Sequence, residues 1–321
     1  MADIVNERGI SDADILKDTG LQVSELRKRS TLIRYEQVLK MIENAISLYP
    51  EPGLGLLVGS RENITSWGLL GFVMMSAPDL KTSLEIGTKY LAAGPALVDI
   101  RCYPADNDYC IEAYTPMPLG SLLPFVVEEI FSSLYATFPV ILGKPFMAKE
   151  IHLSYSEPSY SDKYDKTFNC PVYFDSPGNY FIVDSSFLSS PLVTANSVSA
   201  ELCISLCEES LINNQYDIDI EYNIRRILVR TPNTFPSMEQ VADELGMSIR
   251  SLRRYLVEKE TSYQKILDDV RMEIAIQLLE NSKVSLADIG ERVGFSEYNN
   301  FRKAFKRWTG TSPTAFREGK T

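Results

Sequence analysis

The sequence contains few of the residues that catalytic and metal sites use most. Its 321 residues include a single histidine, His152, which disfavours mechanisms that need a histidine pair and metal sites rich in histidine. The five cysteines are irregularly spaced and form no Cys-x-x-Cys motif, a pattern typical of a reducing compartment. Glycine-rich phosphate loops and nucleophile-elbow motifs are also absent. These absences favour a protein that is not an enzyme and that holds neither a cofactor nor a metal.

Long apolar runs are absent too. No stretch of 18 consecutive apolar residues occurs, and residues 1–9 lack the basic start and apolar stretch of a secretory signal. We therefore expect a cytoplasmic protein that neither spans a membrane nor is secreted. With 45% hydrophobic and 23% charged residues, the composition is that of a globular protein, and the length favours about two domains.

Positive charge is scarce in the chain as a whole. Lys and Arg number 32 against 43 Asp and Glu, and the resulting net charge of −11 argues at first against nucleic-acid binding. The charge is unevenly divided, however. Two prolines within 231–236 indicate a linker, after which 14 Lys and Arg stand against 13 Asp and Glu, leaving 18 against 30 before it. We therefore expect an acidic domain over residues 1–231 and a near-neutral domain over 232–321.

The second domain contains an internal repeat. The segment that begins at Ser237 aligns with the one that begins at Ser285, and each carries a Gly-x-Ser motif, at Gly246–Ser248 and Gly294–Ser296. Each glycine can end a helix in the left-handed conformation, and each serine can cap the helix that follows. The repeat therefore predicts two helix-turn-helix units.

The second helix of each unit is predicted to be apolar on one face and basic on the other. Leu252 and Leu256 in the first copy correspond to Phe301 and Phe305 in the second. The opposite faces carry the cations Arg250, Arg253 and Arg254, and Arg302, Lys303, Lys306 and Arg307. A helix of this kind fits the major groove of DNA, where Arg and Asn read base edges. A solvated basic face on a small helical bundle is the alternative.

Residues 263–280, between the two units, are predicted to form one long helix. Val270, Ile274 and Leu278 recur every four residues along one side. A rise of ~1.5 Å per residue gives this helix a length of ~27 Å. A spacer of that length can hold two recognition helices about one turn of DNA apart, roughly 34 Å. One chain would thereby read two adjacent major grooves.

About the last 85 residues closely resemble the DNA-binding domain of the AraC/XylS family of transcription regulators. Three stretches carry the resemblance: Asp268–Arg271, Val293–Glu297 and Ala304–Pro313. It implies an all-α domain with two helix-turn-helix units joined by a long helix, bound to double-stranded promoter DNA. Carried over by position, the first recognition helix presents Arg250, Arg253 and Arg254, and the second presents Tyr298, Asn299, Asn300, Arg302 and Lys303, with Lys306 and Arg307 directed to phosphate.

Four positions depart from the family pattern. Glu260 stands where many members have Gly. Arg302–Lys303 stands where Ser–Arg is common, so the sequence of the second half-site does not transfer from relatives. Gly290 stands where Ala is usual, and we expect this substitution to loosen the second unit.

Residues 1–231 are predicted to form an α+β domain with a small sheet. Ser11–Asp14 has the pattern of a capping box, and an apolar stripe from Val38 to Tyr49 indicates a longer helix. Asp106–Asp108 is a hairpin signal. Further helices are expected over 63–76, 80–93, 119–138 and 196–213, and strands over 98–103, 109–114, 151–155, 172–174 and 180–183.

This first domain resembles the effector domain, often labelled arabinose-binding, of a subset of the same family. The residues that carry the resemblance are Gly68–Gly71, Pro78–Leu80, Pro158–Tyr160, Tyr164, Phe168 and Phe174, within a similar region of about 33–211. It implies a sensor for a small molecule, without identifying arabinose as the ligand, and by analogy a homodimer formed through this domain.

Candidate chemistry in the first domain is sparse. Glu128 and Glu129 are adjacent and diverge around a helix, so they do not form an acid/base pair. The tyrosine-rich segment 155–168 is either a polar-aromatic pocket wall or a surface loop. His152 is interpreted as structural. Cys203 and Cys207 share a helix face and are interpreted as small buried hydrophobic residues, with a redox switch as the alternative.

The sequence therefore predicts a sequence-specific transcription regulator controlled by a small-molecule effector. Activation by contact with RNA polymerase is the first expectation, and repression is the second. A DNA-repair alkyl-transfer enzyme fused to the DNA-binding module is a third hypothesis. It is disfavoured because its reactive cysteine would need an adjacent base or metal, and no metal-thiolate spacing is present.

Overall fold

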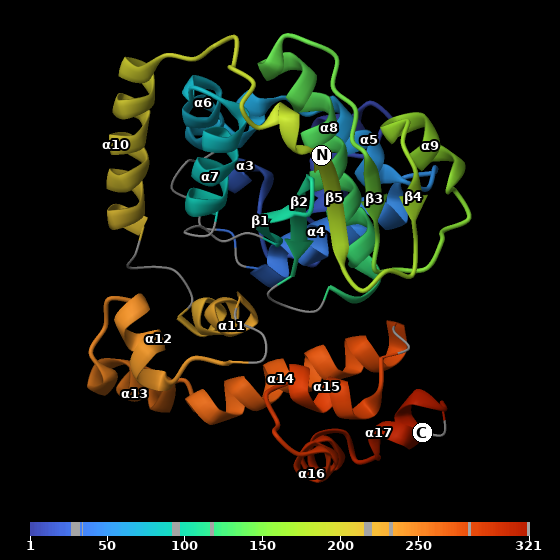
Figure 1. Cartoon of the computed structure of the whole chain (residues 1–321), viewed down its shortest axis with the longest axis vertical. Helices are drawn as coiled ribbons and strands as arrows, with labels where there is room; N and C mark the ends of the chain where they lie inside the picture. Colours follow the sequence, from blue (N-terminus) through green and yellow to red (C-terminus); the bar gives the residue numbers. More distant parts are fainter. Residues whose placement is uncertain are drawn as a thin grey trace. The chain divides into compact units, whose positions relative to one another are not determined.

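The computed structural model describes residues 1–26, 33, 35–91, 97–115, 119–214, 220–230, 234–281 and 284–319 (Figure 1). The chain forms two compact units. The first is drawn from residues 1–213, and the second comprises mainly Asn214–Thr321. The five strands assigned in the described residues all belong to the first unit.

The first unit combines its sheet with α-helices that range from four to 20 residues. Ser11 caps α2 through the predicted capping box with Asp14. The expected helix over 63–76 divides at Gly68 into a 3-10 turn and α6. The helical elements are α1 (Ala2–Asn6), α2 (Asp12–Ile15), α3 (Val23–Leu26), α4 (Tyr35–Leu48), α5 (Leu54–Arg61), η1 (Ile64–Trp67), α6 (Gly68–Ser76), α7 (Leu80–Leu91), η2 (Gly120–Leu122), α8 (Leu123–Leu142), α9 (Asp162–Phe168), η3 (Ser185–Phe187) and α10 (Ser197–Asn214).

The strands form a single sheet in the order β1-β2-β5-β3-β4. The predicted hairpin is confirmed, because β1 and β2 are antiparallel with Ala105 opposite Asp108. Strand β5 lies between the hairpin and β3, and β3 pairs with β4 in parallel. The α+β prediction is therefore confirmed. The strands are β1 (Asp99–Ala105), β2 (Asp108–Tyr114), β3 (Glu150–His152), β4 (Val172–Tyr173) and β5 (Asn179–Asp184).

Helix α8 is the centre of the first core. Its Phe131 and Phe138 rings lie 5.5 and 6.2 Å from the Phe181 ring of β5, which places the helix against the sheet. The stretch Gly120–Leu142 is long and apolar enough to cross a membrane by length and composition alone. Two thirds of its most apolar window is buried, however, so α8 is a core helix.

The segment 155–168 is not simply a surface loop. It contains α9, which the sequence did not predict, and the side chain of Tyr164 is buried in the core. The buried Glu128 carboxylate explains this placement, because it accepts hydrogen bonds from the hydroxyls of Tyr160 (2.8 Å) and Tyr164. Burial raises the pKa of Glu128, and these hydrogen bonds oppose the shift.

The cysteines lie in apolar surroundings. Cys207 packs with Val73 and Tyr90, and Cys203 lies beside the same cluster. Burial raises the pKa of Cys102 to about 12 and that of Cys110 to about 11, so neither thiol ionises appreciably at neutral pH. The interpretation of Cys203 and Cys207 as small hydrophobic residues fits this packing.

The histidine has aromatic and acidic neighbours. The His152 ring stacks on Tyr173, with 4.9 Å between the ring centroids, and its Nε2 lies 3.1 Å from the Glu150 carboxylate. These contacts support a structural role for His152.

The second unit is helical, and its two helix-turn-helix units are confirmed. Helices α12 and α13 form the first, α15 and α16 form the second, and α14 joins them. Each has its own apolar core, around Leu252 and Leu256 in the first and around Phe301 and Phe305 in the second. The helices are α11 (Ile220–Arg230), α12 (Met238–Glu244), α13 (Ile249–Glu258), α14 (Tyr263–Asn281), α15 (Leu286–Arg292), α16 (Tyr298–Thr309) and α17 (Pro313–Arg317).

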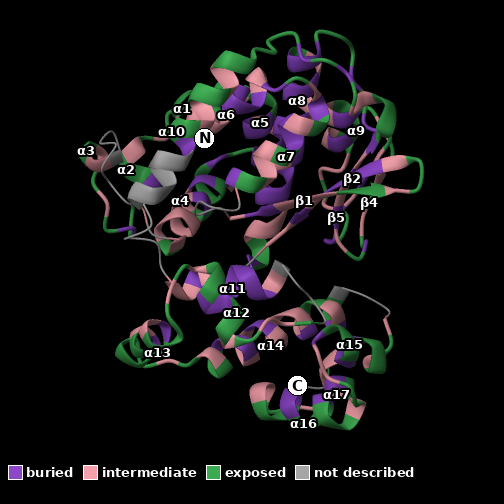
Figure 2. Ribbon diagram, turned by 60° about the vertical axis from the view of Figure 1, so that its left-hand side comes forward, coloured by how far each residue is buried: buried purple, intermediate pink, exposed green. Residues whose placement is uncertain are grey.

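Helix α11 differs from expectation, because it lies in the second unit, N-terminal to the expected boundary at 231/232. Its Ile224, Ile227 and Leu228 are 0%, 7% and 0% exposed, packed with Val241 and Leu252 (Figure 2). The physical reason is the apolar face of α11, which covers the core of the first helix-turn-helix unit. Residues 231–233, where the boundary was expected, lie outside the described residues.

Candidate nucleic-acid interface

The first recognition helix is positioned by local hydrogen bonds. Ser237 caps α12 in a capping box with Gln240. Gly246 then takes the left-handed conformation, with φ 65°. As predicted, Ser248 caps α13, and its hydroxyl accepts a hydrogen bond from the Ser251 backbone N–H at 3.1 Å. The turn and cap together set the direction in which α13 leaves α12.

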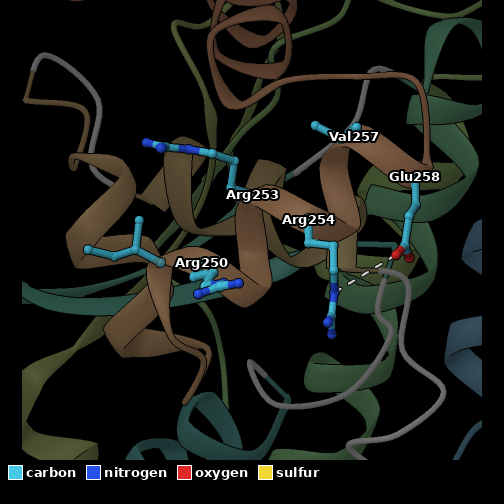
Figure 3. A pocket seen from close by; sticks show the side chains of 6 residues that line it. Arg250, Arg253, Arg254, Val257 and Glu258 are labelled. Carbon is cyan, nitrogen blue, oxygen red and sulfur yellow. Dashed lines mark ion pairs between the residues drawn. The ribbon is translucent and has the colours of Figure 1, made fainter.

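The outer face of α13 carries three exposed arginines. Arg250, Arg253 and Arg254 project from the helix while Leu252 and Leu256 are buried on its inner face (Figure 3). With three other residues of α13, these arginines line an open pocket. The Glu258 carboxylate lies 3.8 Å from the Arg254 guanidinium in an exposed pair. Exposed ion pairs of this kind contribute little free energy, so the pair does not prevent Arg254 from binding another anion.

The second recognition helix begins one residue later than predicted. Glu297, not Ser296, is the N-cap of α16, and its side chain makes no capping hydrogen bond. The cause is one extra residue in the second copy, because Phe301 follows Ser296 by five positions whereas Leu252 follows Ser248 by four. As predicted, Gly294 takes the left-handed conformation, with φ 80°, directly after the C-cap of α15.

The exposed face of α16 carries most of the residues predicted to contact DNA. Tyr298 differs, because it is half-buried and its ring centroid lies 6.3 Å from that of Phe301. Six predicted contact residues are exposed on this helix: Asn299, Asn300, Arg302, Lys303, Lys306 and Arg307.

Arg307 is also tied to the linker helix. One of its terminal nitrogens lies 2.9 Å from an Asp268 carboxylate oxygen, although the Arg307 side chain remains 66% exposed. The sequence predicted a phosphate contact for Arg307 but did not predict this pair.

Two other acids of α14 are paired with a cation of α11. The Arg225 guanidinium lies 3.0 Å from the Glu273 carboxylate and 3.5 Å from that of Asp269. Arg225 therefore balances part of the acidic charge of α14 within the unit.

The two departures from the family pattern outside α16 have visible consequences. A Cβ atom built on Gly290 would lie 3.2 Å from the Cβ of Phe301, so the glycine gives this phenylalanine room. The first unit has Ala242 and the smaller Leu252 in the equivalent core. The expected loosening is thus replaced by close packing. Glu260 takes the left-handed conformation, with φ 54°, which disfavours any residue with a side chain.

Sequence reasoning missed three residues that organise this unit: Arg225, paired with acids of α14, and Phe235 and Arg271, which contact each other as a ring and a guanidinium. The apolar residues of α11 follow a helical spacing, from Ile220 through Ile224 and Ile227 to Leu228, and this signal could have found the helix. Arg271 lies in a motif that carries the family resemblance, but its partners are distant in the sequence.

Two family profiles match the chain. The one described as the arabinose-binding domain of the AraC transcription regulator, N-terminal, matches residues 9–192. The one described as a helix-turn-helix domain matches residues 241–319. The first match alone spans more than half of the chain.

Relatives match along most of the chain as well. The Ornithine utilization regulator of Pseudomonas aeruginosa is 30% identical over 99% of this chain and 94% of its own length. The HTH-type transcriptional regulator VqsM of the same species is 28% identical over 82% of this chain and 83% of its own length. The crystal structure of the transcriptional regulator CdpR from P. aeruginosa is 23% identical, covers 87% of this chain and 90% of that one, and gives a TM-score of 0.46.

A mixed α/β unit followed by two helix-turn-helix units defines a transcription regulator that binds DNA. This chain belongs to the AraC family, with an arabinose-binding-type N-terminal domain and a helix-turn-helix C-terminal domain. The family is not enzymatic, and the hypothesis of a repair enzyme fused to a DNA-binding module is therefore rejected.

Proposed function

We propose that the chain recognises promoter DNA through α13 and α16 and activates transcription when its first unit binds a small molecule in the cytoplasm. The observation that carries this proposal is the exposure of basic side chains on the outer faces of both recognition helices, joined on α16 by two exposed asparagines. Arg250, Arg253 and Arg254 contact the first half-site. Asn299, Asn300, Arg302 and Lys303 contact the second half-site, Tyr298 borders it, and Lys306 and Arg307 bind phosphate.

The direction of regulation is tested by transcription in vitro. Purified RNA polymerase is supplied with a promoter that carries the selected binding site, with and without the full-length chain. An activator raises the transcript yield by recruiting the polymerase. A repressor, which is the second candidate within the class, lowers it by occupying the same site.

The effector is sought among small metabolites. One relative is named for ornithine utilization, so basic amino acids and their breakdown products are the first compounds to screen. A ligand that binds only the folded state stabilises it by about 2.7 kcal/mol at one hundred times its dissociation constant. A metabolite that raises the melting temperature of the full chain, but not that of residues 214–321, is an effector of the first unit.

Self-association through the first unit completes the proposal. On α10, Val198, Leu202 and Leu206 follow each other every four residues and are 75%, 61% and 43% exposed, while the opposite side of the helix packs on α6 and α7. A two-fold dimer needs a patch that complements itself, and an apolar stripe on one helix meets that need. Leu202→Glu should shift the sedimentation coefficient to that of a monomer. Val140→Glu, at an exposed apolar residue of α8, is the matched control.

A further inference from the structure

Four consecutive residues of α14, 268–271, each contact a different part of the second unit. Asp268 pairs with Arg307 of α16, and Asp269 pairs with Arg225 of α11. Val270 is completely buried in the first apolar core. The fourth residue, Arg271, lies between the two helix-turn-helix units. The linker helix therefore does more than separate the two recognition helices.

Arg271 lies between two aromatic rings. The carbon of its guanidinium lies 5.0 Å from the ring centroid of Phe235 and 5.1 Å from that of Phe295. Phe235 packs against the core of the first helix-turn-helix unit, and Phe295 packs against the core of the second. A planar guanidinium can stack on aromatic faces, so this one side chain joins the two units.

The surroundings of Arg271 are closely fitted to it. Its Nε is buried without a hydrogen-bond partner among the described residues, and burial lowers its pKa. A Cβ atom built on Gly294 would lie 3.0 Å from an Arg271 terminal nitrogen and 3.0 Å from the Phe235 ring. A side chain at that position would therefore press on both members of the stacked arrangement.

We infer that Arg271 is a positioning residue that holds α13 and α16 at one fixed separation and orientation, and thereby sets the spacing between half-sites that the protein accepts. The inference rests on the proposed function of both helices as DNA readers. Held between the rings, the guanidinium acts on DNA through the geometry of the two units and not by direct contact. A merely stabilising role would lower the fraction of active protein without changing which spacing is preferred.

The test uses the full-length chain and duplexes that the wild-type protein selects from a random-sequence library. From the best duplex, variants are made with one base pair added or removed between the two protected segments, and a further duplex keeps only one segment. We expect the wild-type chain to lose at least about tenfold in affinity when the spacing changes, which corresponds to about 1.4 kcal/mol.

Arg271→Met replaces the arginine with a long unbranched apolar side chain and removes the charged, planar group that stacks on the two rings. We expect it to bind the original duplex about tenfold more weakly, to discriminate between spacings by less than about threefold, and to bind the single-segment duplex like the wild type. Arg271→Lys keeps the charge without the planar group, so its spacing preference should fall between those of the other two proteins.

Two glycine variants provide a matched control. Gly246 and Gly294 both have positive φ, 65° and 80°, so alanine strains the backbone at both positions. A Cβ atom at Gly246 meets nothing within 4 Å, whereas one at Gly294 meets Arg271 and Phe235. Gly294→Ala should therefore weaken the spacing preference, and Gly246→Ala should leave it intact.

The outcomes separate this inference from the proposed function. A folded Arg271→Met protein that keeps the wild-type spacing preference overturns the inference. If that variant fails to fold, Gly294→Ala and Phe235→Leu decide the question by the same criterion. If the wild-type chain selects no duplex at all, the proposed function itself is wrong.

Discussion

Removing α11 should unfold the first helix-turn-helix unit. The comparison is between two fragments, residues 214–321, which keep the helix, and residues 232–321, which lack it. The shorter fragment corresponds to the domain expected from the two prolines near residue 232. The longer fragment corresponds to the compact unit that the structure contains.

The expected loss follows from the burial of three side chains. Ile224, Ile227 and Leu228 are almost completely buried against the first core. Burying one side chain of this size contributes about 1.5–3 kcal/mol, so their removal costs about 5–9 kcal/mol. A domain of this size is stable by only about 5–15 kcal/mol in total, and most of that stability would be lost.

Urea unfolding followed by circular dichroism measures the difference. The longer fragment should unfold in one cooperative transition and bind the selected duplex. The shorter one should unfold at much lower urea or without a cooperative transition, and it should bind only weakly. Ile224→Ala in the longer fragment should cost about 2–5 kcal/mol, whereas Ile249→Ala, at an exposed position, should cost little. Equal midpoints for the two fragments would refute the packing of α11 described above.

Three further predictions concern strain, pH and salt. Glu260→Gly should stabilise residues 214–321 by about 1 kcal/mol, because Glu260 has φ 54°; an unchanged urea midpoint would contradict this. Burial raises the pKa of Glu129 from 4.5 to about 7. Between pH 4.5 and about 7, Glu129 therefore holds a proton in the folded state that it has lost in the unfolded state. Its contribution to stability is greatest below pH 4.5 and falls as the pH rises to about 7. Glu129→Gln should remove that part of the pH dependence in thermal melts of the full chain, and a melting profile identical to that of the wild type would show that Glu129 ionises normally. If Lys306 and Arg307 make the main phosphate contacts, the slope of log affinity against log salt should be shallower than about −4, and a slope near −10 would mean many more phosphate contacts.

The elements with local signals could be predicted from the sequence. The glycine turns and the caps at Ser237 and Ser248 act within a few residues, so the two helix-turn-helix units follow from the repeat. The hairpin of β1 and β2 is equally local. The exposure of the cationic face of α13 could also be predicted, because the apolar face with Leu252 and Leu256 is buried and the opposite face is left to solvent.

The remaining features depend on partners far apart in the chain. Helix α9 is held in the core by the hydrogen bond that its Tyr164 hydroxyl donates to Glu128, 36 residues earlier in the sequence. The pair between Arg307 and Asp268 spans 39 residues, and that between Arg225 and Glu273 spans 48. The N-cap of α16 is Glu297 and not the expected Ser296 for another reason. One inserted residue changes which residue caps the helix without changing the apolar pattern. Periodicity and local spacing carry no information about such contacts.

Hydroxyl-radical footprinting on the selected duplex tests most directly whether α13 and α16 read two adjacent major grooves. The wild-type chain should protect two segments about one helical turn apart, roughly 34 Å. Arg254→Ala should weaken protection of one segment and Lys303→Ala that of the other, each with a loss of about 1–3 kcal/mol, whereas Lys265→Ala on α14 should change neither. A single protected segment, or footprints that neither substitution changes, would contradict the account.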